Sequence, residues 1–517
     1  MRRLSALDAS FIYLEDDHSP MHIGGVYLMD AATAPKGFSY EMFHAHIRDR
    51  LASSRIFRER LVEPPIGLAH PCWINDPGFQ LDRHLPRLSL PAPGGRRELM
   101  HVAAHVFGEV LDRRRPLWSL SFVEEVNGVD GFAPGSYAMI SKVHHAAVDG
   151  GSGVELMAAL LDISPVPGRV EHDDWQPEEI PGSLALVGGA WAGMGRKSKE
   201  LGQVLGEVAR GAARIYGARR AERIDPPPTL LSAPRTRLNR AVSSSRTFWG
   251  TDFDFERYRA LRRQVPGVTV NDVVLCQCAG ALRAYLAERD ELPRKSLIAM
   301  TPVSVRQERD RGKMGNQVSA MLADLATDEP DPLRRLLRIR RGTTGSKVYA
   351  SAMPAHRIAE FIPSETLAAA ARVYTRMRLG GRHRPFFNLI ITNVPGPSTP
   401  LYLAGARLGA QFGMAPIIDG LGLMVVVLTH AGRLSISLTS CYRVVPDPDH
   451  LAHLMDAALI DLERSVAAAP ADSLRIDDED LPDAERGDDA APALQRLRRA
   501  SRDLDRAIAT LDRRLRE

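Results

Sequence analysis

Apolar residues in the first 165 positions occur either in short continuous runs or three and four residues apart. The first pattern predicts strands and the second predicts helices. The short apolar runs Gly24–Leu28 and Tyr137–Val143 lie between turn-forming residues and are typical of buried strands. Helices are predicted at Phe43–Leu51 and Leu99–Val110. In the second of these, apolar residues at positions 99, 102, 103, 106, 107 and 110 share one helical face. This mixture indicates layered α/β structure rather than an all-helical bundle.

A second region with the same mixture spans residues 241–466. A helix is predicted at Val270–Leu286, with Thr269 or Asn271 as its N-cap. Strands are predicted at Arg246–Phe253, Leu297–Pro302, Asn388–Thr392, Leu423–Leu428 and Leu434–Thr439. The pattern therefore predicts two α/β subdomains, residues 1–165 and residues 241–466.

The segment between them, residues 166–240, is a predicted linker. Ser164–Gly182 is rich in proline and acidic residues and indicates an exposed connection. Leu184–Ile224 then has an apolar helical stripe together with many arginines. Such a helix either packs its stripe on the protein body or lies on an anionic membrane surface.

The last predicted segment, residues 467–517, combines an acidic linker with a helical tail. Asp477–Asp489 contains eight acidic residues and is typical of a solvated stretch. After Pro492, leucine and isoleucine recur mostly three and four residues apart in a short heptad-like pattern. This helix either pairs in a homodimer, folds back on its own chain, or remains a solvated tail.

Composition and charge exclude several classes of protein. Hydrophobic residues make up 44% and charged residues 25% of 517 residues, as in soluble globular proteins. The formal net charge of +4 gives no large positive field, so we expect no nucleic-acid partner. The four cysteines form no CxxC pair, which disfavours a zinc knuckle or a disulfide scaffold.

The N-terminal residues also bear on location. Acidic residues interrupt the first 20 positions, so we expect no signal peptide, and no apolar run reaches 18 residues. The expected location is cytoplasmic, with peripheral membrane contact left open.

Candidate chemistry centres on the stretch from Ser141 to Gly153, which follows one predicted strand and precedes a helix. It contains His144, His145, Asp149 and Gly150 at a strand end, where α/β proteins often place functional sites. A histidine four residues before a carboxylate suits a general base for a hydroxyl or thiol. The spacing alone also fits a solvated or core histidine pair. A metal site is disfavoured, because no cysteine or third histidine lies nearby in the sequence. No GxSxG, Walker or dinucleotide-binding motif is evident, so the sequence does not support a hydrolase, an NTPase or a dehydrogenase.

The segment His144-His145-Ala-Ala-Val-Asp149-Gly150 resembles the HHxxxDG signature of the CoA-dependent acyltransferase superfamily. Other segments narrow the resemblance to bacterial wax ester synthase/acyl-CoA:diacylglycerol acyltransferases, in order from about residue 4 to residue 450. They are Leu4-Ser-Ala-Leu-Asp8-Ala-Ser-Phe-Ile-Tyr-Leu-Glu15, Pro20-Met21-His22-Ile-Gly24-Gly25, Pro116-Leu-Trp118, Asn271-Asp272-Val-Val-Leu275, Pro302-Val-Ser-Val-Arg306, Gly315-Asn316 and Thr392-Asn393-Val-Pro395-Gly396-Pro397.

The resemblance implies a fold and a reaction. It implies two acyltransferase-like subdomains, with mixed sheets flanked by helices, and an active site at their interface. The implied reaction moves a fatty acyl group from acyl-CoA to diacylglycerol, with His145 as general base. No metal or bound cofactor is implied, because acyl-CoA is a substrate. The alternatives are a wax ester synthase using fatty alcohols, a condensation-type enzyme using carrier-protein thioesters, and a non-catalytic lipid-binding protein.

Roles for further residues follow from the resemblance. His144 and Asp149 would join His145 as catalytic residues of the motif, with a structural role as the alternative for His144. Asp149 would organise the loop through an arginine. Arg306 is the suggested partner, although it could instead bind CoA phosphate or face solvent.

Substrate-side roles are implied for Gly150 and for three residues in the second half. Asn271 and Asp272 would shape the site, although helix capping alone explains them. Asn393 would polarise the substrate or stabilise an oxyanion, whereas the Gly and Pro after it form a turn. The Pro116-Leu-Trp118 segment is either a packing turn or a wall of the acyl channel.

One departure from the family pattern concerns acceptor choice. Family members commonly carry Ser-Tyr where this chain has Thr429-His430. Threonine keeps a hydroxyl, and His430 would alter acceptor preference or simply pack. The lipid acceptor also implies a membrane or lipid-droplet surface as a partner.

Overall fold

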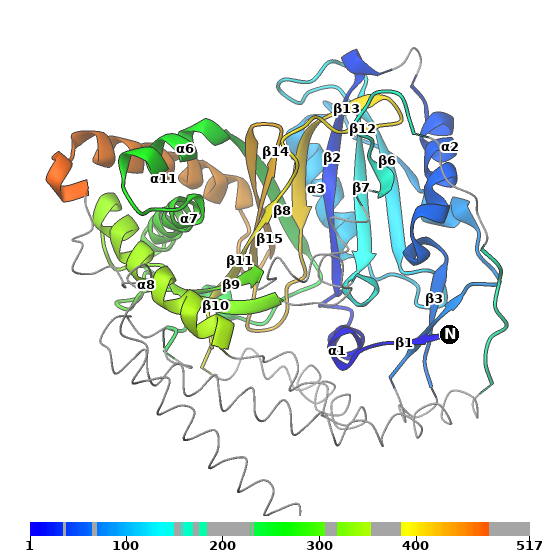
Figure 1. Ribbon diagram of the computed structural model, residues 1–517, viewed down its shortest axis with the longest axis horizontal. Helices are drawn as coiled ribbons and strands as arrows, with labels where there is room; N and C mark the ends of the chain where they lie inside the picture. Colours follow the sequence, from blue (N-terminus) through cyan, green and yellow to red (C-terminus); the bar gives the residue numbers. More distant parts are fainter. Residues whose placement is uncertain are drawn as a thin grey trace, which may run out of the picture.

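Two six-stranded β-sheets stand side by side with helices on their faces in the computed structural model of the chain (Figure 1). The structure describes residues 1–34, 38–64, 70–148, 157, 159–168, 175–182, 228, 232–304, 318–352 and 384–474. The predicted mixed α/β class, with two sheets flanked by helices, is confirmed.

The first sheet has the strand order β12-β13-β2-β7-β6-β5. Its pairs are antiparallel except for β5 with β6. The register places His22, the first residue of β2, opposite His144, the last residue of β7. The strands are β2 (His22–Asp30), β5 (Arg87–Ser89), β6 (Trp118–Val126), β7 (Ser136–His144), β12 (Tyr402–Leu403) and β13 (Ala406–Met414).

This sheet lies between two helices, α2 (Tyr40–Arg50) and α3 (Arg96–Gly108). Alternate residues of β2 show why: Tyr27 and Met29 pack in the cluster that contains α2 side chains. Val26 and Leu28 pack with α3. A strand that is buried on both faces has a continuous run of apolar residues. Its successive side chains point alternately toward the helix on one face and the helix on the other.

Helix α3 ends two residues before the predicted boundary, and a buried lysine caps it. The Lys142 Nζ on β7 donates to the main-chain oxygens of Val106, at 2.8 Å, and Glu109, at 2.9 Å. A cation at the carboxyl end of a helix satisfies free carbonyls and the helix dipole. Burial lowers the pKa of Lys142 to about 8, while Glu109 and Glu15 oppose that shift.

The second sheet has the order β10-β9-β11-β14-β15-β8, and β11 runs parallel to both β9 and β14. Its strands are β8 (Arg246–Asp254), β9 (Ile298–Ser304), β10 (Val318–Asp324), β11 (Leu389–Pro395), β14 (Leu423–His430) and β15 (Arg433–Cys441). Figure 1 shows a layer of helices on the side of this sheet away from the first sheet. They are α6 (Phe255–Gln264), α7 (Val270–Ala287), α8 (Pro332–Ala352) and α11 (Pro448–Ala468).

Strands β12 and β13 lie late in the chain but pair in the first sheet. β13 runs antiparallel to β2, with Met414 opposite Gly24. It also meets the second sheet closely. A Cβ built on Gly250 of β8 would lie 2.3 Å from the Phe412 ring, and one on Gly413 would lie 2.5 Å from Val426. The small residues at these positions allow β13 to join the two sheets.

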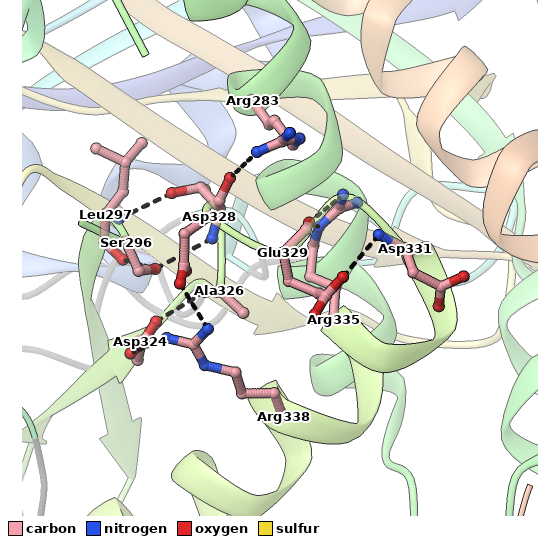
Figure 2. Close-up of polar contacts among 11 residues, drawn as sticks. Arg283, Ser296, Leu297, Asp324, Ala326, Asp328, Glu329, Asp331, Arg335 and Arg338 are labelled. Atoms are coloured by element: carbon pink, nitrogen blue, oxygen red, sulfur yellow. Dashed lines mark hydrogen bonds and ion pairs between the residues drawn. The ribbon is translucent and has the colours of Figure 1, made fainter. Parts of the chain in front are cut away.

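Polar contacts fix the connection between β10 and helix α8 (Figure 2). The Arg283 guanidinium on α7 donates to the Thr327 carbonyl at 2.7 Å. Arg338 of α8 contacts the carboxylates of Asp328, at 2.8 Å, and Asp324, at 3.2 Å. Arg335 donates to main-chain carbonyls of the same loop. The carbonyls and carboxylates of this connection therefore anchor helix α8 to the sheet and to helix α7.

A small three-stranded sheet and helix α1 (Ala6–Leu14) complete the first half. The sheet has the order β1-β4-β3, with β1 at Arg2–Arg3, β4 at Cys72–Asn75 and β3 at Glu59–Val62. Helix α1 packs Ala9 and Ile12 in one cluster with Ala146, a residue that follows β7. This contact brings α1 to the end of the strand that carries the two histidines.

Several predicted segments lie outside the described residues. They include all of the predicted basic helix of residues 184–224 and the tail from residue 475 onward. The described helices contain none with the length and apolar character needed to cross a lipid bilayer.

Candidate active site

The two histidines of the HHxxxDG motif occupy the carboxyl end of β7. His144 is the last residue of this strand, and His145–Ala147 form a 3-10 turn, η6. The His144 N–H donates to the Leu117 carbonyl at 2.9 Å, and the His145 N–H donates to the Met21 carbonyl at 2.7 Å. Leu117 precedes β6 and Met21 precedes β2. The segments on both sides of β7 therefore hold the turn.

The His145 ring lies against an aromatic side chain of α1. It stacks on Phe11 with 3.9 Å between ring centroids and 15° between ring planes. Burial, with a smaller contribution from His144, lowers the pKa of His145 to about 4, while its own carbonyl opposes the shift. The imidazole is therefore neutral at physiological pH. A neutral ring has the lone pair that a general base needs.

A buried polar cluster lies next to this turn. The Glu15 carboxylate approaches His144 Nε2 at 3.3 Å and His22 Nε2 at 3.4 Å. Two guanidinium nitrogens of Arg113 contact Glu15 Oε2, at 2.8 and 3.0 Å. Burial lowers the pKa of His22 to about 4, so this ring is also neutral at physiological pH. We call Glu15, His22, Arg113 and His144 the Glu15 cluster.

The sequence pattern indicates no chemical role for Glu15, His22 or Arg113. The first two had served only as landmarks of the family resemblance. One signal was present: Glu15 and His22 are ionisable residues flanking the start of a predicted buried strand. Ionisable residues at buried positions need partners, so such positions merit attention before the fold is known.

Three predicted site residues lie outside the described part of the chain. They are Asp149, Gly150 and Arg306. The roles of Asp149 and Gly150, and the pairing of Asp149 with Arg306, therefore stay predictions.

Asn271 and Asp272 lie in the first turn of α7. Thr269 is the N-cap, and Asp272 closes a capping box with it: Asp272 Oδ2 accepts the Thr269 N–H at 2.9 Å. The other Asp272 oxygen accepts the Thr343 hydroxyl of α8 at 2.7 Å. Asp272 is fully buried and ties α7 to α8. Among the described residues, no hydrogen bond or ion pair joins Asp272 to the His145 turn.

Asn393 is a half-buried residue of β11, opposite Val427 of β14. Its side-chain amide forms no hydrogen bond with the part of the chain that the structure describes. The turn that follows needs a glycine, because a Cβ on Gly396 would lie 2.1 Å from the Thr429 carbonyl oxygen. The Gly396 N–H donates to the Thr429 hydroxyl at 3.2 Å. The threonine at the departure from the family pattern thus uses its hydroxyl to hold this turn.

His430, the other residue at this departure, is buried at the end of β14. Burial lowers the pKa of its imidazole, and the carbonyls of Leu408 and Pro397 partly oppose that effect. A neutral ring packed at this position fits the packing interpretation of the substitution. Its effect on acceptor preference stays a prediction.

The Pro116-Leu-Trp118 segment borders the histidine turn. Its Leu117 carbonyl accepts the His144 N–H, as described above. The indole N–H of Trp118 donates to the Phe57 carbonyl at 2.9 Å. The same indole stacks on His84 with 4.4 Å between centroids. These buried contacts are those of a packing turn.

The described residues include no group of three or more His, Cys, Asp or Glu side chains arranged to hold a metal ion. The four cysteines are buried and unpaired.

Comparisons with known proteins agree on one family. Residues 4–274 match the wax ester synthase/diacylglycerol acyltransferase catalytic domain, and residues 314–463 match the C-terminal domain of the same family. A Mycobacterium tuberculosis H37Rv protein provisionally named a diacylglycerol O-acyltransferase is 33% identical over 86% of this chain and 87% of its own. The O-acyltransferase WSD of Acinetobacter baylyi is 33% identical over 87% of this chain and 94% of its own.

Solved structures extend the likeness to the fold. The wax ester synthase/diacylglycerol acyltransferase of Marinobacter aquaeolei VT8 superposes with a TM-score of 0.62 at 28% identity. The match covers 90% of this chain and 100% of that one. The first condensation domain of the CDA synthetase superposes with a TM-score of 0.52 at 15% identity, over 91% of this chain and 98% of that one. This second likeness concerns the fold alone.

Proposed function

The chain belongs to the wax ester synthase/diacylglycerol acyltransferase family, and from that premise we propose that it transfers a fatty acyl group from acyl-CoA to the hydroxyl of diacylglycerol. The observation that carries the proposal is the neutral, half-buried His145 directly after β7. This residue type at a strand end, in the family's motif, suits the activation of an alcohol.

The proposed reaction is a direct transfer. His145 accepts the proton of the acceptor hydroxyl as its oxygen attacks the thioester carbonyl carbon. A C–O bond forms, and a tetrahedral oxyanion results. When it collapses, the C–S bond breaks and the proton leaves His145 for the CoA sulfur. The products are an ester and free CoA thiol. Asn393 is our candidate for polarising the carbonyl oxygen.

The depressed pKa of His145 predicts the pH dependence of the reaction. Only the neutral imidazole accepts a proton, so a pKa lowered from 6.5 to about 4 moves the acidic loss of activity to lower pH. The value of kcat/KM should stay nearly level from about pH 8 to pH 6 and fall only below about pH 5, because it reports the free enzyme. Initial rates of CoA release in overlapping buffers measure this. A halving of kcat/KM near pH 6.5, with the fold intact by circular dichroism, would contradict it.

Diacylglycerol is the proposed acceptor, and fatty alcohol is the alternative. A competition assay tests the choice. Palmitoyl-CoA is supplied with equal amounts of dipalmitoylglycerol and hexadecanol, and the ester products are separated, identified and quantified by mass spectrometry. We expect mainly triacylglycerol. Mainly wax ester would favour the alternative. Faster turnover of palmitoyl-acyl carrier protein than of palmitoyl-CoA would favour a condensation-type enzyme, and lipid binding without turnover would favour a non-catalytic member.

We also propose peripheral attachment to a membrane or lipid-droplet surface, because the acceptor is dissolved in lipid. The arginine-rich stretch of residues 196–223 is the candidate contact, on sequence alone. Sedimentation with anionic liposomes tests it. Replacing Arg210, Arg214, Arg219 and Arg220 by Glu should release the protein, and unchanged sedimentation would exclude this stretch.

A homodimer through the predicted helix after residue 492 is a further proposal. Light scattering on the full chain and on a chain ending near residue 470 tests it. We expect the full chain to be a dimer and the shorter chain to be a monomer. A dimer of the shorter chain would exclude the tail as the contact.

A further inference from the structure

The His144 ring has one tautomer that fits its surroundings. Its Nδ1 accepts the Ala146 N–H at 3.0 Å, so this nitrogen carries a lone pair. A neutral imidazole then carries its proton on Nε2. That nitrogen faces Glu15 Oε1 at 3.3 Å. The separation is long for a hydrogen bond, so the attraction is chiefly that of a carboxylate for a ring N–H.

The Glu15 carboxylate is held as an anion at this position. Burial alone would raise the pKa of the Glu15 carboxyl, but contacts with His144 and His22 more than offset burial and leave the pKa well below its usual range. Arg113 fixes the other carboxylate oxygen with two contacts and also donates to the Ile12 carbonyl of α1 at 2.9 Å. The carboxylate therefore has a fixed charge and a fixed orientation.

The same carboxylate also orders the main chain that holds His145. Glu15 Oε1 accepts the Met21 N–H at 3.1 Å, and the Met21 carbonyl accepts the His145 N–H at 2.7 Å. Helix α1, which leads directly to Glu15, supplies the Phe11 ring on which His145 stacks. Glu15 thus contacts the His144 ring directly and is linked to His145 through the Met21 main chain.

We propose that Glu15 is a positioning residue for His145: it holds the His144 ring at Nε2 and the Met21 main chain, and so sets where the His145 imidazole lies. The inference rests on the acyl transfer proposed above. Glu15 acts through these neighbours and takes no proton from substrate. Its role is comparable to that of outer groups that orient functional histidines elsewhere.

The substitution Glu15→Gln tests the proposal with little change in shape. An amide has one acceptor oxygen and one donor nitrogen, whereas Glu15 faces donors on both of its oxygens. The amide nitrogen must therefore meet either Arg113 or the Met21 N–H and the His144 ring. We expect kcat to fall about 10- to 100-fold, as when an orienting group is lost. The KM for palmitoyl-CoA should change less than about threefold, because the Glu15 side chain is buried and its oxygens are taken up by protein donors.

The matched control is Glu63→Gln. Glu63 is the other carboxylate on Arg113, at 3.3 Å, and its side chain is 49% exposed. It belongs to the same ion-pair network, but Arg113 is its described ion-pair partner. We expect its kcat to stay within about twofold of wild type, as for exposed ion pairs. Equal losses in the two variants would overturn the proposal, because they would assign the effect to the Arg113 network as a whole.

A second readout does not depend on activity. Nitrogen-15 NMR of histidine-labelled protein distinguishes the two ring tautomers, and the His144 signal is identified by its loss in His144→Gln. We expect wild-type His144 to carry its proton on Nε2, and we expect the Nε2 resonance to shift in Glu15→Gln, because the ring N–H loses its carboxylate partner. An unchanged Nε2 resonance, or a wild-type kcat in Glu15→Gln, would overturn the proposal.

The outcomes separate this inference from the proposed function. Inactive wild-type protein would refute the acyl transfer, while the Nε2 resonance of His144 would still decide whether Glu15 holds the His144 ring. If Glu15→Gln fails to fold, Glu15→Asp keeps the charge with a shorter reach. It should then show a kcat loss with a near wild-type KM, and a wild-type kcat in that variant would overturn the proposal.

Discussion

Replacing His145 by alanine should lower the rate of acceptor-dependent CoA release by at least about 100-fold, as expected when a general base is removed. The reaction loses the group that accepts the hydroxyl proton, while the turn keeps its main-chain bonds to Met21 and through His144 to Leu117. The KM for palmitoyl-CoA should change little. The assay is thiol release from palmitoyl-CoA with dipalmitoylglycerol, corrected for release without acceptor.

The control for this variant is His101→Ala, which removes an exposed histidine of α3. It should keep wild-type activity. Circular dichroism and thermal unfolding establish that both variants fold. A folded His145→Ala protein with more than a tenth of wild-type activity would exclude His145 as the general base.

Replacing Gly24 by alanine should unfold or severely destabilise the protein. An added Cβ would lie 1.9 Å from the Ser141 carbonyl oxygen of β7, a main-chain atom that cannot rotate away. Strands β2 and β7 would have to separate next to the His22–His144 pair. We expect a loss of about 3 kcal/mol or more in the free energy of unfolding, at the upper end of the cost of overpacking, and loss of activity with it.

The matched control is Gly342→Ala in helix α8. A Cβ at Gly342 meets no atom within 4 Å, and alanine favours a helix interior by about 0.5–1 kcal/mol over glycine. Urea unfolding of the two variants should therefore give effects of opposite sign. A Gly24→Ala protein as stable as wild type would contradict the tight β2–β7 contact.

Periodicity predicted local structure well where one element is long or strongly patterned. The predicted bounds of strand β7 and of helix α7 agree with the structure to within about one residue at each end. The motif at the end of β7 was sufficient to single out His145 as the candidate base. These features depend on neighbours in sequence, which is why the sequence shows them.

The pairing of β13 with β2 could not be predicted in the same way. The alternation in residues 406–414 is compatible with a strand, but the partner of a strand depends on contacts distant in sequence. Gly250 and Gly413 reveal the close approach of the two sheets only when the neighbouring Phe412 and Val426 are known.

The Glu15 cluster escaped sequence analysis for a related reason. Glu15, Arg113 and His144 come from three separate segments, and no spacing rule connects them. Asp272 shows the opposite case: its capping role was one of the two alternatives left open by the sequence. The structure supplies the capping contacts and adds Thr343 as an unforeseen partner.

The central claim is that this protein joins an acyl group from acyl-CoA to a lipid alcohol with the help of His145. The most direct test is to incubate wild-type protein with palmitoyl-CoA, either alone or with dipalmitoylglycerol or hexadecanol, and to measure the amounts of CoA thiol and ester in the same samples. We expect thiol release that requires the acceptor, with one ester formed for each CoA. Release of CoA without any ester, or no release with either dipalmitoylglycerol or hexadecanol, would contradict the account.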